Sequence, residues 1–191
     1  MKRALLGGSN AGGGSGGSGT VTSVTASGPL TSSGGATPAI TWNGQLSEGQ
    51  ALILDAALSA DGTYSGITQT GTSAAALAFG ELCYRVTASG KWALARADVA
   101  STSANQLGIC VLAAAGADAT TTILLFGKVR ADALFDTFTV GAPVYISAAT
   151  AGKTVSTAPS GTTDFVVRKV GFAEDGNTVF FTPSNDYITL V

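Results

Sequence analysis

The feature that most constrains the fold of this chain is a repeated pattern that continues from Ile67 to the C-terminus. Short apolar or Thr-rich runs alternate with turns that contain glycine. Such runs are typical of β-strands, and many of them at regular spacing are typical of an all-β sandwich or barrel. The pattern therefore predicts an all-β chain with a compact antiparallel β-barrel or sandwich domain. The predicted strands are 76–79, 82–87, 92–95, 108–113, 121–126, 128–131, 143–147, 166–170 and 178–182.

Glycine-containing pairs mark the predicted turns, and the strongest signal is Glu174-Asp175-Gly176-Asn177. An Asp-Gly pair between two apolar runs favours a β-hairpin, because these residues tolerate the positive φ angles of a tight turn. We therefore expect a hairpin at this position. Further turns are expected at Asp61-Gly62, Ser65-Gly66, Ser89-Gly90, Ala115-Gly116, Ala151-Gly152 and Ser160-Gly161.

Composition divides the 191 residues into three parts. Residues 1–19 are mostly Gly, Ser and Ala, which predicts a flexible extended arm, although an engineered linker has the same composition. Residues 20–45 favour short strands, at 21–26 and 40–42, but they have too few apolar residues for a core. This small β segment is therefore expected to pack between subunits, and residues 46–191 are expected to form the C-terminal domain.

One segment of the C-terminal domain, residues 46–58, is a candidate helix. Ser47 is suited to cap its N-terminus, and Glu48 would lie favourably in the first turn. The run Ala51-Leu52-Ile53-Leu54-Asp55 fits a strand equally well. The sequence leaves both interpretations open.

The two halves of the C-terminal domain echo one another in sequence. Two related β units that close on each other would form a small barrel. Generic β meanders also look alike, so the sequence does not decide between duplication and chance. The matched segments are 80–84 with 141–145, 90–91 with 152–153, 107–109 with 170–172, and 122–126 with 178–181.

Composition also excludes several classes of function. The chain has no histidine, and Asp, Glu, Lys and Arg together make up only 12% of it. Ser-His and Cys-His nucleophile pairs are therefore impossible, and the commonest metal ligand is missing. The formal net charge is -2 with no basic stripe, which argues against a nucleic-acid partner. We expect no enzyme activity, no catalytic or metal site and no cofactor.

Two carboxylate pairs are the remaining candidates for catalysis, Asp132 with Asp136 and Glu174 with Asp175. Paired carboxylates serve glycosidases. However, a hairpin turn explains the second pair, and a loop before Phe138 explains the first. These pairs therefore give little support to catalysis.

The remaining sequence signals concern the environment of the chain. Cys83 and Cys110 each lie inside an apolar run, which favours two buried free thiols and leaves a disulfide between them as the alternative. No segment is long and apolar enough to span a bilayer, so membrane insertion is not expected. The apolar part of the Met1-Lys2-Arg3-Ala4-Leu5-Leu6 start is too short for a signal peptide. These signals predict a soluble protein made in a reducing cytoplasm.

Apolar residues divide into predicted core and predicted interface. Most aromatic residues in the strand runs are expected in the core, whereas aromatic residues in loops and in the tail suit contact with a protein or a sugar. The arm and the small β segment add apolar candidates, because a partner must order them. The candidate interface residues are Leu5, Leu6, Val21, Val24, Ile40, Trp42, Phe135, Phe138, Tyr187 and Ile188.

Two stretches of the chain have a familiar pattern. The first runs from Val21-Thr22-Ser23-Val24-Thr25-Ala26 to Thr37-Pro38-Ala39-Ile40. It resembles a β segment common in fibre and virion proteins of tailed bacteriophages. The second runs from Leu54 to the C-terminus and resembles a β domain found near the ends of phage structural proteins. Its motifs are Leu77-Ala78-Phe79-Gly80-Glu81-Leu82-Cys83-Tyr84, Gly127-Lys128-Val129-Arg130-Ala131-Asp132, Val140-Gly141-Ala142-Pro143-Val144-Tyr145 and Phe181-Thr182-Pro183-Ser184-Asn185-Asp186-Tyr187.

The resemblance implies a trimeric, non-enzymatic virion component that is made in the host bacterial cytoplasm. Such domains occur on capsid decoration (cement) proteins, head fibres and tail fibres. This chain is short for a fibre with a shaft and a receptor tip, which favours a decoration protein that binds its own copies and the major capsid protein. The alternative is a tail or baseplate fibre component that contacts tail proteins or a host surface receptor. A carbohydrate-active enzyme is a third hypothesis.

Overall fold

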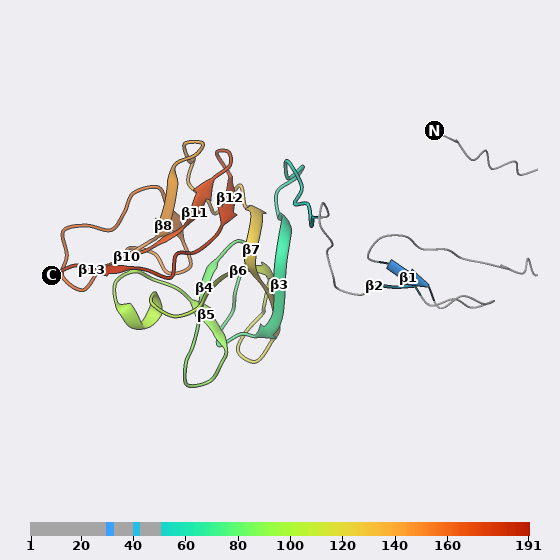
Figure 1. Ribbon diagram of the computed structural model, residues 1–191. Helices are drawn as coiled ribbons and strands as arrows, with labels where there is room; N and C mark the ends of the chain where they lie inside the picture. Colours follow the sequence, from blue (N-terminus) through green and yellow to red (C-terminus); the bar gives the residue numbers. More distant parts are fainter. Residues whose placement is uncertain (1–29, 33–39, 43–50) are drawn as a thin grey trace, which may run out of the picture. The chain divides into compact units, whose positions relative to one another are not determined.

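The computed structural model describes residues 30–32, 40–42 and 51–191, which form strands, turns and one short 3₁₀ segment but no α-helix (Figure 1). The chain divides into two compact units, Met1–Leu52 and Ile53–Val191. The prediction of an all-β fold is confirmed for the described residues.

In the first unit, strands β1 (Leu30–Ser32) and β2 (Ile40–Trp42) pair antiparallel. β2 coincides with the strand expected at 40–42, β1 was not expected, and the strand expected at 21–26 lies outside the described residues. A two-stranded sheet of this size is marginally stable by itself in water. The predicted arm at 1–19 lies outside the described residues.

The second unit contains one antiparallel sheet of nine strands and a separate pair, β10 with β13. The sheet has the order β5-β4-β6-β7-β12-β11-β8-β9, and β3 pairs with β7 outside this path. The 3₁₀ segment η1 (Ala100–Thr102) lies between β5 and β6. The strands are β3 (Thr63–Thr72), β4 (Leu82–Arg85), β5 (Trp92–Leu94), β6 (Leu107–Leu112), β7 (Thr120–Arg130), β8 (Pro143–Ile146), β9 (Thr154–Val155), β10 (Val166–Val167), β11 (Lys169–Ala173), β12 (Thr178–Phe181) and β13 (Ile188–Thr189).

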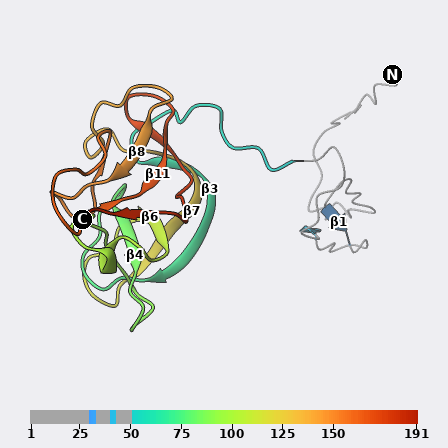
Figure 2. The same ribbon diagram turned by 60° about the vertical axis from the view of Figure 1, so that its left-hand side comes forward.

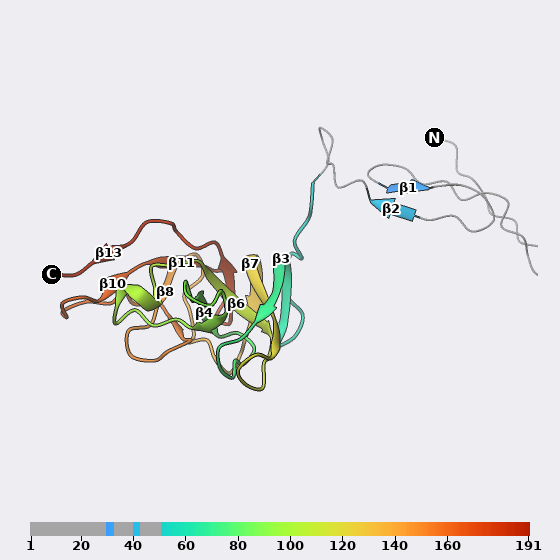
Figure 3. The ribbon, with the colours of Figure 1, turned by 90° about the horizontal axis from the view of Figure 1, so that it is seen from below.

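Strand β7 is the centre of the sheet, because three strands pair with it. β3 follows one edge of β7 along its whole length, from Thr72 opposite Thr120 to Thr63 opposite Arg130. On the other edge, β6 pairs with the first half of β7 and β12 pairs with the second half. β6 and β12 therefore diverge, and the sheet curls into a half-barrel, which Figure 2 and Figure 3 show from two further directions.

Two facing glycines mark the point where β7 exchanges one partner for the other. Gly127 in β7 has a φ of 134°, a conformation that side chains disfavour. It lies opposite Gly66 in β3, and a Cβ atom on either residue would collide with the backbone of the other strand. The absence of side chains therefore allows β3 and β7 to approach closely at the bend.

The curl encloses a core to which both ends of the strand order contribute. Backbone hydrogen bonds join these two ends: the N–H of Leu82 donates to the carbonyl of Gly152, and the N–H of Gly152 donates to the carbonyl of Ala95, both at 2.7 Å. The half-barrel is thus closed by loops around its core. Fully buried members of the core include Leu82, Ile109, Leu124, Val129, Val144, Ile146, Val170, Val179 and Phe181.

A second, smaller cluster covers the opposite face of the first half of the sheet. Trp92 is its largest member and is only 1% exposed. The loop that follows β3 contributes Leu77, and β7 contributes Ile123. The first half of the sheet is therefore buried on both faces.

The echo between the two halves is present in the strand arrangement. β4, β5, β6 and β7 pair in the order β5-β4-β6-β7, and β9-β8-β11-β12 repeats that order. The registers also correspond, because Leu82 lies opposite Ile109 and Pro143 lies opposite Phe172. Burial differs: Leu82 and Ile109 are fully buried, whereas Phe172 is 39% exposed. The two halves therefore have the same strand order, but the corresponding residues are buried in one half and partly exposed in the other.

Several local predictions are confirmed. β11 and β12 form the expected hairpin around Glu174–Asn177, in which the N–H of Asn177 donates to the side chain of Asp175 at 2.8 Å. Predicted turn glycines have positive φ angles, among them Gly62, Gly90 and Gly152. The turn sequences therefore mark the true ends of many strands.

Other local predictions are wrong. Of the two interpretations left open for the segment after residue 46, neither forms where it is described: residues 51–58 are not helical and residues 51–55 are not a strand, and Leu52 and Ile53 are 66% and 90% exposed. Ser65-Gly66 is no turn but lies inside β3, where β7 supplies hydrogen-bond partners. Residues 76–79 form a loop with one isolated bridge at Leu77.

Two strand boundaries also differ from prediction. The runs 121–126 and 128–131 form one strand, β7, because pairing with β3 continues through Gly127. Conversely, the run 166–170 is divided between β10 and β11 at Arg168. In both places, pairing with distant strands decides the boundary.

Candidate interaction surface

The sequence-predicted interface residues fall into three groups. Leu5, Leu6, Val21 and Val24 lie outside the described residues, and Ile40 and Trp42 lie in β2. The loop aromatics Phe135 and Phe138 are buried in the core, and the tail residues Tyr187 and Ile188 are exposed. Among the four candidates whose exposure is described, the two tail residues are the exposed ones.

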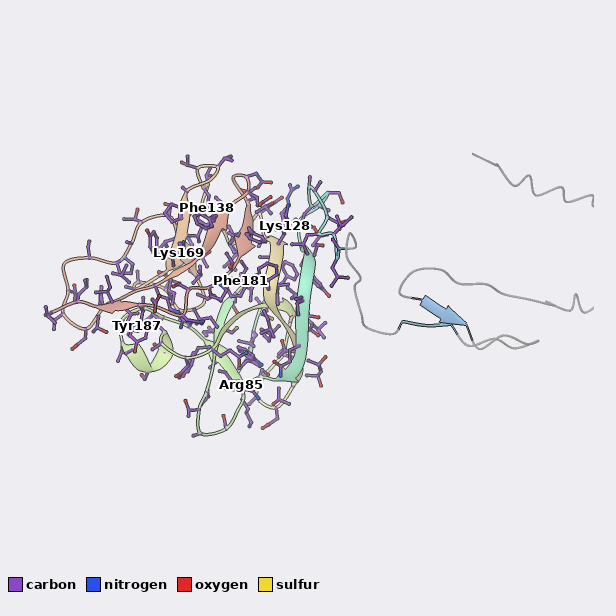
Figure 4. All side chains as sticks on the ribbon, viewed as in Figure 1. Arg85, Lys128, Phe138, Lys169, Phe181 and Tyr187 are labelled. Atoms are coloured by element: carbon purple, nitrogen blue, oxygen red, sulfur yellow. The ribbon has the colours of Figure 1, made fainter. Side chains whose placement is uncertain are left out.

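The prediction that Phe135 and Phe138 face a partner is wrong. They are 6% and 4% exposed, and their ring centroids lie 5.8 Å apart. The loop turns inward because the N–H of Phe135 donates to the carbonyl of Ala131 and the N–H of Phe138 donates to that of Gly176, both at 3.0 Å. Figure 4 shows Phe138 and Phe181 in the second unit, where both belong to the same core.

The exposed tail borders an open depression of about 250 Å³. Tyr187 and Ile188 are 44% and 66% exposed. Figure 4 shows Lys169 and Tyr187 on the part of the unit away from β3. Aromatic, charged and hydroxyl groups all border this depression, which is lined by Tyr145, Val167, Lys169, Ser184, Asp186, Tyr187 and Ile188.

A buried guanidinium holds the strands beside this depression. Arg168 is 4% exposed, and burial lowers its pKa. Its Nη1 donates to the carbonyls of Ser103 and Asn105 at 2.6 and 2.7 Å, and its Nε donates to the carbonyl of Ser184 at 2.8 Å. Among the described residues, no carboxylate forms a salt bridge with it. Arg168 therefore joins the loop after η1 to the tail.

A row of apolar side chains on the surface crosses five neighbouring strands. Ile67 on β3 lies opposite Phe126 on β7, and the ring of Phe126 packs edge-on against Phe180 on β12, with centroids 5.3 Å apart. Phe180 lies opposite Phe172 on β11, which in turn lies opposite Pro143 on β8. We call these five residues the outer apolar row.

The outer apolar row is partly open to solvent. Ile67 is 56% exposed, Phe126 is 40% exposed and Phe172 is 39% exposed. Lys169 lies over the ring of Phe172, with its Nζ 4.2 Å from the centroid. Such rows of exposed apolar side chains on a folded unit mark sites of association.

The outer apolar row departs from the sequence-based expectation that most strand aromatics lie in the core. That prediction is confirmed for Trp92 and Phe181, which are 1% and 0% exposed, but Phe126 and Phe172 lie on the surface. Alternation within a single strand would have separated Phe180 from Phe181. Alternation alone does not show whether Phe180 or Phe181 points into the core.

Two basic residues beside the outer apolar row, Lys128 and Arg130, are paired with carboxylates. The Nζ of Lys128 lies 2.8 Å from the Glu174 carboxylate, and it also donates to the carbonyl of Ala56 at 3.3 Å. Arg130 forms a two-pronged contact with Asp132 at 2.8 and 3.0 Å. Lys128 and Arg130 are thus neutralised by carboxylates, whereas Lys169 lies over the Phe172 ring and forms no salt bridge among the described residues.

These ion pairs also bear on the carboxylates considered for catalysis. The hydrogen bond from Arg130 lowers the pKa of Asp132. Burial would raise the pKa of Asp175, but hydrogen bonds from Asn177 and Thr178 lower it overall. Asp136 lies 2.7 Å from the Nζ of Lys153. A glycosidase needs one carboxyl group with a raised pKa, and the lowered values of Asp132 and Asp175 do not supply it.

Neither the cysteines nor the carboxylates of the described residues form a metal-binding cluster. Cys83 and Cys110 are both buried and unbonded, as predicted. Burial raises the pKa of both thiols. Within residues 51–191, no group of three or more Cys, Asp or Glu side chains is placed to hold a metal ion.

Comparison with known proteins gives no relative. No protein-family model matches the chain, and no curated protein or solved structure does either. In the part of the chain that the structure describes, there is no helix long and apolar enough to cross a membrane.

Proposed function

We propose that this chain is a non-enzymatic structural protein of a tailed-phage virion, most closely a trimeric capsid decoration protein that binds and stabilises the head shell. The resemblance of its motifs to phage structural proteins supports the virion location. Several motif residues shape the fold: Gly80 and Gly141 have positive φ angles, and Gly127 permits the bend in β7. The proposed partners are other copies of the chain and the major capsid protein.

The observation that carries the binding role is the outer apolar row. It lies on a curled sheet whose other face packs into the core, so the row is held in place before any partner arrives. A protein that covers such a row removes apolar surface from water, at roughly 25 cal/mol per Å². Binding to the assembled shell and not to free subunits stabilises the shell by mass action.

Cryo-electron microscopy of the particle that carries this chain tests the proposal. We expect many copies at threefold positions of the capsid lattice, with the outer apolar row against a neighbouring protein. Quantitative mass spectrometry of purified particles gives the copy number independently. Absence of the chain from the particle would overturn the proposal.

The depression beside Tyr187 favours a second candidate function, host attachment by a tail or baseplate fibre component. Two tyrosines, Tyr145 and Tyr187, border it together with Lys169 and Asp186. Aromatic faces beside charged groups suit protein and sugar surfaces. Density confined to the tail would favour this function, and a Tyr187→Ala variant would then weaken host adsorption.

A further inference from the structure

Strand β3 presents an edge that is unusually well suited to pairing. It has ten residues, Thr63–Thr72, with neither a charged residue nor a proline. One edge pairs with β7, and within the described residues no strand pairs with the other edge. Figure 1 shows β3 beside β7 at the margin of the second unit. Natural edge strands are commonly protected by charge, proline or shortness, and β3 has none of these features.

The outer apolar row ends at this edge. Ile67 is its last member and is 56% exposed, more than Phe126 or Phe172. A strand added to β3 would place its own side chain beside Ile67. The most exposed part of the row and the unpaired backbone edge are thus the same place.

We propose that β3 pairs antiparallel with β3 of a second copy of this chain, across a twofold axis at Ile67. In this register, Ile67 lies opposite its counterpart, and Ser65 lies opposite Gln69. These three residues alternate along one face of the strand, since successive strand residues point to opposite faces. The contact joins apolar to apolar and polar to polar.

The other face of β3 is also self-complementary in this register. Tyr64 lies opposite Thr70, and Gly66 lies opposite Thr68. Aromatic and β-branched pairs across strands are favourable, and no like charges oppose each other because β3 has no charge. An interface about a twofold axis uses the same patch on both copies, which a self-complementary strand satisfies.

The charges at the two ends of β3 are compatible with this arrangement. At the Thr63 end, Arg130 is paired with Asp132 at 2.8 Å. At the Thr72 end, Lys91 is paired with Asp118 at 2.6 Å. Antiparallel pairing brings these two ends together, so the Lys91–Asp118 pair of one copy meets the Arg130–Asp132 pair of the other, beside Asp61, which accepts a hydrogen bond from the Asp132 N–H at 2.8 Å.

The proposed pairing extends the outer apolar row from one copy into the next. It does not depend on the virion location. Because like edges pair only about a twofold axis, this contact is separate from the trimer contact that the resemblance implies. On a shell of trimers it would join copies from neighbouring trimers.

Sedimentation velocity and native mass spectrometry of the full chain, from low micromolar to several hundred micromolar, test the proposal. We expect assemblies with an even number of copies. Ile67→Lys places two ammonium groups opposite each other and should weaken association at least about tenfold. Ile67→Glu should do the same with two carboxylates.

Mixing the Ile67→Lys and Ile67→Glu variants gives the decisive result. The new lysine of one copy would lie opposite the new glutamate of the other only if the axis passes through this position. An equimolar mixture should therefore restore pairing through β3, whereas neither variant pairs with itself through this edge. Val140→Lys is the matched control, because Val140 is a loop residue that is 70% exposed. Circular dichroism checks that each variant is folded.

Three results would overturn the proposal. The first is a wild-type chain that stays monomeric throughout the concentration range. The second is a trimeric assembly that Ile67→Lys leaves intact. The third is a mixture of the two variants that remains as dissociated as each variant alone. The first result would leave β3 as an edge for another protein, and the second would assign assembly to a different surface.

Discussion

Replacement of the buried Arg168 should be among the most damaging single changes in the second unit. Its guanidinium is 4% exposed and donates to three carbonyls, those of Ser103, Asn105 and Ser184, at 2.6 to 2.8 Å. Arg168→Met keeps much of the aliphatic stem and removes every donor. Three carbonyls from two distant loops then lose their partner at once.

The expected change in the free energy of unfolding is the hydrogen-bond energy lost minus the cost of burying the charge, which methionine avoids. A hydrogen bond to a charged group contributes about 1.5–3 kcal/mol, so three together contribute roughly 4–9 kcal/mol. Burying a charge without a countercharge costs several kcal/mol, and methionine avoids that cost. We expect a net loss of about 3 kcal/mol in the free energy of unfolding. With a urea m-value of about 2 kcal/mol/M, the midpoint falls by about 1.5 M.

Urea unfolding followed by Trp92 fluorescence measures this loss, since Trp92 is 1% exposed and its emission should shift on unfolding. A Trp42→Phe background removes the other tryptophan of the chain. Arg85→Met is the matched control, because Arg85 is an exposed arginine in β4 that donates to Gly90 and Gln106 at 3.2 and 3.5 Å (Figure 4). Its loss should stay within about 0.5 kcal/mol. If the Arg168 and Arg85 variants are equally stable, the reasoning is refuted.

Four further results are expected. Gly127→Ala should lower the free energy of unfolding by at least about 2 kcal/mol, because its φ of 134° and the nearby backbone disfavour a side chain; thermal unfolding measures this. Asp132 has a lowered folded pKa, so it stabilises the fold above the unfolded pKa of about 4, and that contribution disappears as the pH falls through the folded value; Asp132→Asn should show a weaker pH dependence in acid unfolding. Cys83 and Cys110 should resist an aromatic disulfide reagent in the native state and react in urea; rapid labelling without denaturant would contradict their burial. Deletion of residues 1–19 should weaken attachment to particles and leave the thermal midpoint of the C-terminal domain unchanged; full decoration by the truncated chain would contradict an anchoring arm.

Sequence signals located the turns of this fold better than its strand boundaries. The hairpin at Glu174–Asn177 and the positive φ angles at Gly90 and Gly152 depend on local backbone preferences, which a sequence carries directly. The boundaries depend on distant pairing. Gly127 interrupts an apolar run, yet β3 pairs with β7 on both sides of it. Neither the helix nor the strand considered for residues 46–58 forms in the part that is described, where Leu52 and Ile53 are 66% and 90% exposed.

The outer apolar row shows why the candidate surface was harder to predict than the fold. Residues 122–126 and 178–181 are both continuous apolar runs after a threonine, and such runs do not reveal which face is covered. In the first half of the sheet, Trp92 and its neighbours bury the face opposite the core, so Ile123 and Leu124 are both 0% exposed. In the second half, among the described residues no equivalent cluster covers that face, and Phe172 is 39% exposed. The same kind of run is therefore buried on both faces in one half and partly exposed on one face in the other. A bound partner would cover the second half as Trp92 covers the first.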